Sequence, residues 1–295
     1  MLAPLLEMDT VPLQRQSSSR AWHLLGLGLV AAWLLAMARM AGGFSPSAAL
    51  ETLDPRRLAG HLEEHEQWLT VYLQQRRAGY LHRRLQAWGS GYRLQQRLRL
   101  GLRLAGREWH IDGRLEATLD SSGGLRHFTY HLAGGGLEGS LEGHYRKGQL
   151  LLSGALAGVK LDRRLALAEP PLLDSLLPLL LARYQLRVGR SYSVRLFDPR
   201  RLANRPQRLE VVERQVLDTT NGLQPALHLR SGRGETRTEM WIDEEGHLLR
   251  QESPLGLRLV ATGEAAARSA VSTPAEIEAV DSGAVLRWLG GQDGE

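Results

Sequence analysis

The sequence contains no cysteine. This absence excludes a disulfide framework, a zinc site built on thiolates, an iron–sulfur cluster, a cysteine nucleophile and an acylated lipobox cysteine. Lysine is nearly absent too, because Lys147 and Lys160 are the only lysines among 37 basic residues. The arginines are spread along the chain and no aromatic-rich nucleic-acid motif accompanies them, so we expect no nucleic-acid partner.

Aromatic residues are also scarce, at 6% of the 295 residues, whereas hydrophobic residues make up 43%. This is the composition of a globular protein with enough apolar material for a sizeable core. It excludes a chain that is disordered throughout. The length suits one large domain or two small ones.

A long hydrophobic run lies near the N-terminus. Residues 21–38 are apolar except for His23, and Arg15 and Arg20 precede them. Extended to Phe44, the run is long enough for a bilayer, which requires about 20 residues. The two arginines keep the N-terminus in the cytoplasm under the positive-inside rule.

These features predict a single-pass protein of the bacterial inner membrane, with a cytoplasmic n-region over 1–20, a transmembrane signal anchor over 21–44 and the rest in the periplasm. A signal peptide cleaved after Ala38 is the alternative, because Ala36-Met37-Ala38 has the small-x-small form of a cleavage site. The long n-region and the arginine directly after that site favour the uncleaved anchor. A buried helix of a soluble protein is a third interpretation.

The body of the chain has the period of β-structure. In the clearest strand, Leu94, Leu98, Leu100, Leu102 and Leu104 alternate with mostly basic residues, so one face is apolar and the other is cationic. Glycine-rich turns separate further short segments of this kind. After a helical connector over 45–66, these patterns predict a β-rich domain over 67–267.

We expect a hairpin of residues 68–73 and 80–85 around a turn at Arg77–Gly79. Further strands are predicted at 107–119, 125–132, 137–145, 149–156, 159–167, 190–196, 208–217, 226–232, 236–242, 247–252 and 256–261. So many strands in one domain favour a mainly β fold with a strongly curved, half-barrel-like antiparallel sheet.

One segment breaks this pattern, because residues 170–184 are apolar nearly all round and must be buried. Its apolar part, 172–182, is too short to span a bilayer. We predict one apolar helix in or over the concavity of the sheet, acting as a lid over a hydrophobic cavity. An ordinary core helix that fills the concavity is the alternative. The candidate ligand-binding residues, chosen by composition, are Leu172, Leu173, Leu176, Leu177, Leu180 and Leu181.

No motif establishes catalytic chemistry. The string from His61 to His65 matches the H-x-x-E-H pattern of zinc peptidases, but it lies in the connector and has no third ligand in view. His127 and His131 share a strand face, with His110 and His144 on neighbouring strands. No acidic residue has a spacing that would identify it from the sequence as a third metal ligand. We expect no metal, no cofactor and no enzymatic activity.

The C-terminal residues 268–295 are acidic and rich in small residues, which predicts a flexible tail. The apolar positions Ile277, Val280, Ala284, Val285 and Trp288 have helical spacing. They permit a short amphipathic helix that docks on an envelope protein partner. A linker is the alternative.

Several short strings carry a resemblance that covers about residues 67–267. They are Trp68–Leu73, Ala78–Tyr80, Ile111–Gly113, the leucine-rich segment after Glu169-Pro-Pro, Gly189–Tyr192, Phe197–Pro199, Met240–Glu252 and Leu255-Gly256. Together they resemble the β-rich envelope domain that precedes bacterial transglutaminase-like domains. They are more distantly similar to the superfamily of periplasmic lipoprotein carriers.

The resemblance implies an antiparallel sheet wrapped around helices, with a hydrophobic concavity that holds acyl chains in the carriers. No catalytic domain follows residue 270, and without cysteine the transglutaminase triad cannot form. The leading hypothesis is a membrane-anchored, non-enzymatic periplasmic domain that binds a lipid or lipoprotein acyl chain. The alternative is a structural or interaction subunit of an envelope complex without an open pocket.

Overall fold

The computed structural model describes residues 50–54, 62–104, 107–134, 137–156, 158–198, 203–232, 237–253, 256–270 and 275–277. The predicted n-region, the anchor over 21–44 and residues 278–295 of the predicted tail lie outside these residues. Among the residues that are described, no helix has both the length and the apolar character needed to cross a membrane.

Within this described part, sixteen strands form a single sheet in the order β1-β10-β11-β12-β13-β14-β15-β2-β3-β4-β5-β6-β7-β8-β9, with β16 beside β4. Neighbouring strands are antiparallel, except that β1 runs parallel to β10 and β16 runs parallel to β4. The strands are β1 (Glu51–Leu53), β2 (His65–Leu73), β3 (Arg76–Trp88), β4 (Gly91–Leu104), β5 (Arg107–Leu119), β6 (Leu125–Gly134), β7 (Leu137–Arg146), β8 (Gln149–Leu156), β9 (Val159–Ala166), β10 (Ser191–Asp198), β11 (Ala203–Thr219), β12 (Gly222–Ser231), β13 (Thr238–Ile242), β14 (Leu248–Ser253), β15 (Leu257–Thr262) and β16 (Ala275–Ile277).

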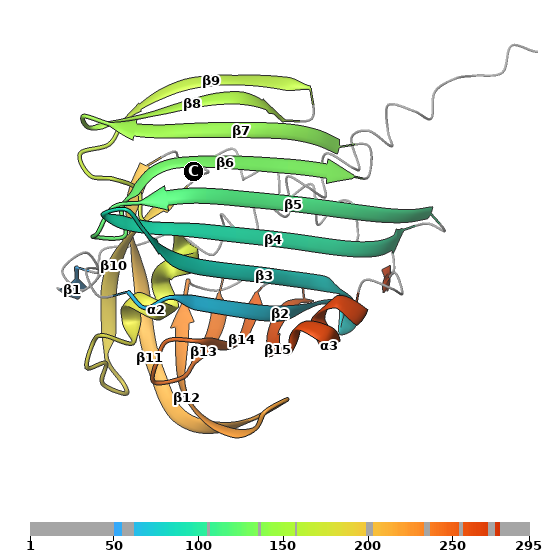
Figure 1. Ribbon diagram of the computed structural model, residues 1–295. Helices are drawn as coiled ribbons and strands as arrows, with labels where there is room; N and C mark the ends of the chain where they lie inside the picture. The colour runs from blue at the N-terminus through green and yellow to red at the C-terminus, as the bar shows by residue number, and fades with distance from the viewer. Residues whose placement is uncertain are drawn as a thin grey trace, which may run out of the picture.

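The sheet consists of two meanders, β2 to β9 and β10 to β15, which join where β15 pairs with β2. In Figure 1 the first meander crosses the view and the second turns away beneath it, so the sheet curves around a concavity. The chain between the two meanders is hydrogen-bonded to both of them. Leu125 N of β6 donates to Pro171 O at 2.8 Å, and Phe197 N of β10 donates to Leu172 O at 3.3 Å. The predicted mainly β fold with a strongly curved sheet is confirmed.

The predicted apolar helix lies in the concavity (Figure 1) but is shorter than expected. It comprises the 3-10 turn η3 (Asp174–Leu176) and the α-helix α2 (Leu177–Leu181). A helix of this length is not stable in isolation, so burial must hold it in place. Leu176, Leu180 and Leu181 are each 0% exposed and belong to the main hydrophobic core.

The first predicted turn is wrong by a few residues. Gln74 and Gln75, with φ values of 49° and 67°, form the turn between β2 and β3. Gly79 instead lies within β3, beside an irregularity in its pairing with β2. A Cβ at Gly79 would lie 1.8 Å from the carbonyl oxygen of Arg99, so this position requires glycine because another backbone approaches it closely.

The predicted helical connector and flexible tail both differ from the structure where the structure describes them. Residues 51–53 form β1, and Leu53 is buried in the core; β2 already begins at His65. At the other end, α3 (Glu264–Ser269) packs on β2 and β3, and its Arg268 guanidinium lies 4.8 Å from the Trp68 ring centre. Residues 51–53 and 65–66 of the predicted helical connector are thus strands, and a cation–π contact holds Arg268, the first residue of the predicted tail, against the sheet. Residues 271–274 and 278–295 of that tail lie outside the described residues.

Candidate functional site

The predicted lid residues occupy two environments. Leu172, Leu176, Leu180 and Leu181 are at most 1% exposed and fill the core, and Leu173 is partly buried against them. Leu177 lines a cavity between the helix and the sheet. The concavity is therefore mostly filled by its own helix, and one of the six candidate residues faces the remaining space.

This cavity has a volume of about 80 Å³. Its apolar wall comprises Val71, Leu81, Leu98, Leu100, Leu177, Pro178, Met240, Leu248, Leu257 and Leu259, and its polar wall comprises Arg83, Asp174, Ser175, Ser231, Thr238 and Gln251. Pockets for drug-sized ligands occupy about 300–1,000 Å³. In this closed arrangement the cavity is thus too small for a whole lipid chain.

A row of three polar side chains crosses the concave face of the sheet, and we call it the polar row. Gln67 of β2, Arg83 of β3 and Gln96 of β4 are direct neighbours in the register of the sheet. They are 9%, 7% and 6% exposed, although each occupies an inward position of its strand. Arg83, for example, alternates with the buried residues Leu81 and Leu85.

The polar row is incompletely hydrogen-bonded. The Gln67 Nε2 atom donates to Leu248 O at 2.8 Å. Among the described residues, Gln67 Oε1, Arg83 Nε and Gln96 Nε2 are buried without a hydrogen-bond partner, and so is Thr238 Oγ1 on the opposite wall. An unsatisfied buried polar group costs about 1–3 kcal/mol, so such a group requires an explanation.

Two charged groups meet at the cavity. Burial lowers the pKa of Arg83 to about 10, and the nearby Asp174 carboxylate opposes this shift. Burial likewise raises the pKa of Asp174 to about 6, while Arg83 lowers it. Both groups are therefore ionised at neutral pH. The helix places a carboxylate of the lid beside the one guanidinium that lines the cavity among the described residues.

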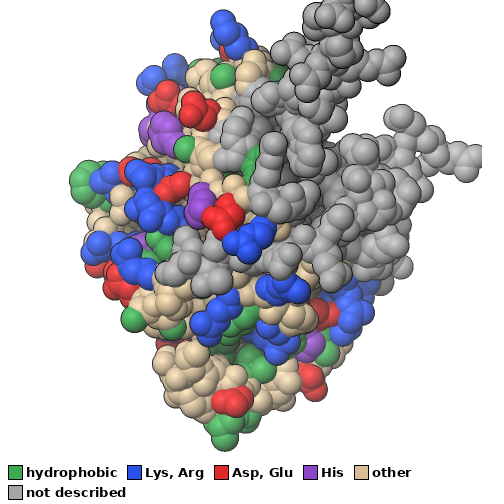
Figure 2. All heavy atoms as spheres, turned by 90° about the vertical axis from the view of Figure 1, so that its right-hand side faces the viewer, with side chains coloured by type: hydrophobic (Ala, Val, Ile, Leu, Met, Phe, Trp, Pro, Cys, Tyr) green, Lys and Arg blue, Asp and Glu red, His purple; other side chains and the backbone are tan. Residues whose placement is uncertain are grey.

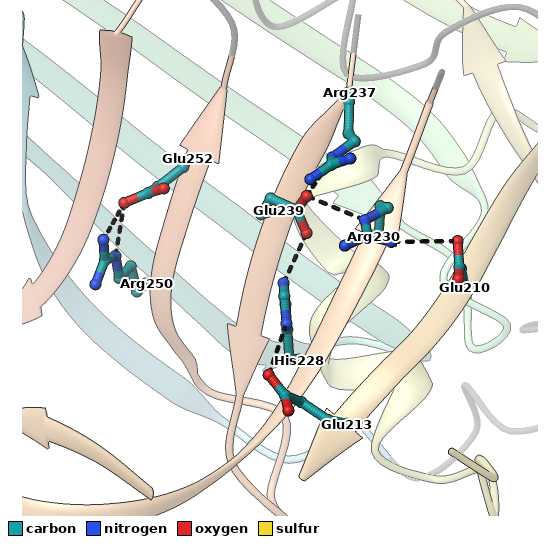
Figure 3. Close-up of polar contacts among 8 residues, drawn as sticks. All are labelled: Glu210, Glu213, His228, Arg230, Arg237, Glu239, Arg250 and Glu252. Atoms are coloured by element: carbon teal, nitrogen blue, oxygen red, sulfur yellow. Dashed lines mark hydrogen bonds and ion pairs between the residues drawn. The ribbon is translucent and has the colours of Figure 1, made fainter. Parts of the chain in front are cut away.

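The convex face of β11 to β14 carries a contrasting set of polar residues. Glu239 accepts hydrogen bonds from His228 at 2.6 Å, from Arg230 at 3.1 Å and from Arg237 (Figure 3). Burial raises the pKa of Glu239, but the three hydrogen bonds outweigh burial and lower it. His228 also stacks on Trp241, with ring centres 4.4 Å apart. Here each buried charge has a charged partner.

The surface seen from one end of the sheet is similarly mixed. Figure 2 shows arginine and lysine side chains interspersed with acidic ones among the described residues. On the convex face of β4 and β5, Asp112 binds Arg97 and Arg99 at 2.8 Å and Arg114 at 3.1 Å. These three arginines thus share one carboxylate, as the cross-strand pairing of opposite charges favours.

The structure brings together two of the histidines considered from the sequence. His127 Nε2 and His144 Nε2 lie 3.0 and 2.9 Å from the same oxygen of Glu142, on the convex face of β6 and β7. These side chains are a third to a half exposed, and two hydrogen bonds lower the pKa of Glu142. The ligand atoms of the three side chains lie within 4.8 Å of one another, so Glu142 is the acidic third ligand that the sequence did not reveal, and the cluster could hold a metal ion. Exposed groups of this kind are also common without one.

The zinc-peptidase string is not a helical motif. His61 lies outside the described residues, and His65 begins β2, where its ring stacks on His247 at 4.4 Å. Burial, with the positive groups His247 and Arg83, lowers the pKa of His65 to about 4. The i, i+4 geometry that such a zinc site needs is therefore not formed from His65.

The polar row was missed from the sequence although one signal was available. The leucines of β4 alternate from Leu94 to Leu102, and Gln96 interrupts them at an apolar position. A buried polar residue is more informative than an exposed apolar one. The alignment of Gln96 with Arg83 and Gln67 depends on the register of three strands, which no single strand reveals.

The fold and the site define a curved β-sheet protein whose concavity holds an apolar helix, a small cavity and a buried arginine. Residues 70–262 match the family described as "Protein of unknown function (DUF3108)", so the chain belongs to the DUF3108 family. A comparison with curated proteins found no match.

Two solved structures are similar to this chain. A β-barrel-like DUF1849 protein from Brucella abortus has 10% identity and a TM-score of 0.47, covering 68% of this chain and 97% of that one. A DUF1089 family protein from Pseudomonas aeruginosa has 13% identity and a TM-score of 0.33, covering 72% and 96%. None of these descriptions names a transglutaminase-associated or lipoprotein-carrier domain, so that finer resemblance stays an expectation.

Proposed function

We propose that this protein is a non-enzymatic domain that binds a hydrophobic ligand, a lipid or a lipoprotein acyl chain, in the concavity beneath α2. The observation that carries the proposal is the cavity itself, which lies between an apolar helix and the inner face of the sheet. A second support is that only a short helix covers this space, so its removal would expose a larger apolar surface.

The closed cavity requires the lid to move before a chain can enter. Exposing Leu177, Leu180 and Leu181 costs about 5–9 kcal/mol at about 1.5–3 kcal/mol for each side chain. Burying an acyl chain of about 12 carbons contributes about 9 kcal/mol at about 0.8 kcal/mol per methylene. A chain of about 12 carbons therefore offsets even the upper end of the cost of opening the lid, whereas chains shorter than about six carbons do not offset its lower end.

The same proposal places the domain at the bacterial inner membrane. The hydrophobic run 21–44 anchors the chain as a single span, and Arg15 and Arg20 keep the preceding residues in the cytoplasm. The domain then lies in the periplasm, next to the lipids of the bilayer. An anchored domain of this kind meets its ligand without crossing the envelope.

The proposal is tested by native mass spectrometry and lipid extraction on full-length protein purified from a bacterial envelope. A stoichiometric hydrophobic ligand, present on the wild type and lost on heating the protein to unfold it, is the expected result. An empty protein would contradict the proposal, provided that a known lipid carrier retains its cargo in a parallel preparation.

A second candidate function is a structural or interaction subunit of an envelope complex. The filled concavity favours it, because Leu176, Leu180 and Leu181 already occupy most of the space that a ligand would take. This function predicts an envelope protein partner that depends on the C-terminal tail. Comparing pull-downs of the full chain and of a chain truncated after residue 277 tests it, since the truncated chain keeps every described strand. Equal recovery of partners would exclude the tail as the contact.

A further inference from the structure

We propose that the hydrophobic ligand carries an anionic headgroup, a carboxylate or phosphate, and that Arg83 binds this headgroup. The inference rests on the proposed function, since it assumes that the concavity takes the apolar part of the ligand. It assigns the ligand to a chemical class, the anionic amphiphiles.

The geometry of Arg83 is that of a binding group. The side chain is 7% exposed, lines the cavity, and has a buried Nε atom without a hydrogen-bond partner among the described residues. Guanidinium groups bind carboxylates and phosphates through two parallel hydrogen bonds. Arg83 thus offers donors to an anion on the polar wall of a cavity whose other wall is apolar.

The surroundings of Arg83 extend this site. Gln96 Nε2, the next member of the polar row, is a further buried donor without a partner among the described residues, and Thr238 Oγ1 lies on the opposite wall of the cavity. A headgroup beside Arg83 has several oxygens to share among such donors. Polar groups that converge on an apolar pocket are what fixes a ligand's orientation in binding sites.

Stability of the fold does not account for Arg83. A buried charge is costly unless it is paired and hydrogen-bonded, and replacing both members of a buried charged pair with uncharged groups is often neutral or stabilising. The arginines on the convex face show the alternative, because Arg97 and Arg99 bind Asp112 at 2.8 Å and remain partly exposed. Arg97 Nε is buried without a partner as well, but Arg97 binds Asp112 through another nitrogen, whereas the more deeply buried Arg83 interacts with Asp174 only electrostatically among the described residues.

In the closed state, the carboxylate of Asp174 supplies the negative charge near Arg83. This carboxylate belongs to η3, lines the same cavity and interacts electrostatically with Arg83. When the lid opens, Asp174 leaves with it, and the headgroup of the ligand replaces the carboxylate as the negative charge near Arg83. Asp174 is therefore a competitor for the ligand as well as part of the lid.

The test is a titration of the full-length protein in an uncharged detergent, followed by native mass spectrometry. The probes are laurate, dodecyl phosphate, dodecanol and dodecyltrimethylammonium, which share one chain length, together with inorganic phosphate and acetate. We expect laurate and dodecyl phosphate to bind at least about tenfold more tightly than dodecanol, because a charge-assisted hydrogen bond is worth roughly twice a neutral one. The cationic probe is expected to bind least.

The variant Arg83→Met is expected to lower laurate affinity to that of dodecanol, while dodecanol binding stays the same. Arg84→Met is the matched control, because Arg84 is the next residue of the strand, is exposed and faces outward. This control should still bind laurate more tightly than dodecanol, as the wild type does. Asp174→Asn should bind laurate several-fold more tightly than the wild type. Circular dichroism confirms that each variant is folded, and Gln96→Met gives a second, milder reduction if Arg83→Met fails to fold.

The outcomes separate this inference from the proposed function. Equal binding of laurate and dodecanol, unchanged in Arg83→Met, would overturn the headgroup site and leave hydrophobic binding intact. Binding of no twelve-carbon probe at all would contradict the proposed function itself. If inorganic phosphate bound as tightly as laurate, the site would take a free anion, and the assignment to amphiphiles would be overturned.

Discussion

The polar side chains on the two faces of the sheet differ in the partners that they bind. On the convex face, Glu239 is bound by three basic side chains, and Asp112 is bound by three arginines. On the concave face, the polar row keeps three buried atoms without hydrogen-bond partners among the described residues. Single atoms on the convex face, Arg97 Nε and His228 Nδ1, also lack a hydrogen-bond partner among the described residues, but each of these side chains binds a carboxylate through another atom. The difference between the faces is therefore that, within the described part of the chain, the polar row has no carboxylate hydrogen-bonded to it.

This difference shows that the arrangement of the strands does not prevent pairing. Cross-strand neighbours satisfy the buried charges around Glu239, although these strands belong to the same curved sheet. The polar row has equally close neighbours in register, but they are two amides and one guanidinium without a carboxylate among them. An anion completes such a set, and in the closed state the lid brings one, Asp174, to the same cavity.

The largest effect is expected at the helix that covers the concavity. Leu180→Asp would bury a carboxylate at a position that is 0% exposed, and we expect a loss of about 4 kcal/mol or more in unfolding free energy. Urea denaturation followed by tryptophan fluorescence measures this change. A variant of wild-type stability would show that the helix is not packed in the concavity.

The next effect concerns the paired face. Glu239→Ala leaves His228, Arg230 and Arg237 without their shared acceptor, and we expect a loss of about 2 kcal/mol. Glu213→Ala is the matched control, because Glu213 contacts the same histidine at 3.6 Å but is 55% exposed. It should change the stability by less than about 0.5 kcal/mol. Equal effects of the two substitutions would remove the distinction between buried and exposed partners.

The pH dependence of stability should have opposite signs on the two faces. The pKa of Glu239 lies below its usual value, so its stabilising contribution is present at neutral pH and is lost as the pH falls through that lowered value. The pKa of Asp174 is raised to about 6, so folding favours its protonated form, and stability falls as the pH rises from about 4 to about 6.

Asp174→Asn tests this sign directly. The variant should gain stability relative to the wild type as the pH rises from about 4 to about 7, because the asparagine side chain does not ionise. Urea denaturation at several pH values measures the difference between the two proteins. If the unfolding free energies of the two proteins changed equally with pH across this range, Asp174 would not be held in a desolvated environment.

The smallest effect is expected for Arg84→Met, the outward neighbour of Arg83. Its guanidinium is 46% exposed and lies 3.7 Å from the exposed carboxylate of Glu66. Exposed pairs of this kind contribute little, so the unfolding free energy should change by less than about 0.5 kcal/mol. A larger loss would show that the charge of Arg84 contributes more to the unfolding free energy than an exposed ion pair normally does.

The sequence was sufficient for the strands of the two meanders, though not for β1 and β16, because a one-sided sheet leaves a period of two in its longer strands. The alternation of leucines with arginines over 94–104 gave the strand and its buried face, and the apolar composition of 172–182 gave the helix in the concavity. Composition could not separate the leucines that fill the core from Leu177, which lines the cavity. That distinction depends on how the helix turns against the sheet.

Two further features could not be predicted from one sequence, because each depends on contacts between neighbouring strands. Gly79 looked like part of a turn, but the structure requires glycine there because the backbone at Arg99 approaches it. The polar row arises from the pairing of residues 67, 83 and 96, and a shift of one residue in either register would separate them. Only Gln96, which interrupts an apolar alternation, marked the row within one strand.

The central claim is that Arg83 serves a ligand and not the fold. The most direct test is the unfolding free energy of the double variant Arg83→Met/Asp174→Asn, which removes both charges at the cavity, measured on ligand-free protein by urea denaturation beside the wild type. We expect the double variant to be at least as stable as the wild type, because replacing both members of a buried charged pair is often neutral or stabilising, whereas Arg83→Met alone would leave Asp174 without its partner. A loss of about 2 kcal/mol or more, equal to that expected for Glu239→Ala, would contradict the claim and make Arg83 a structural residue.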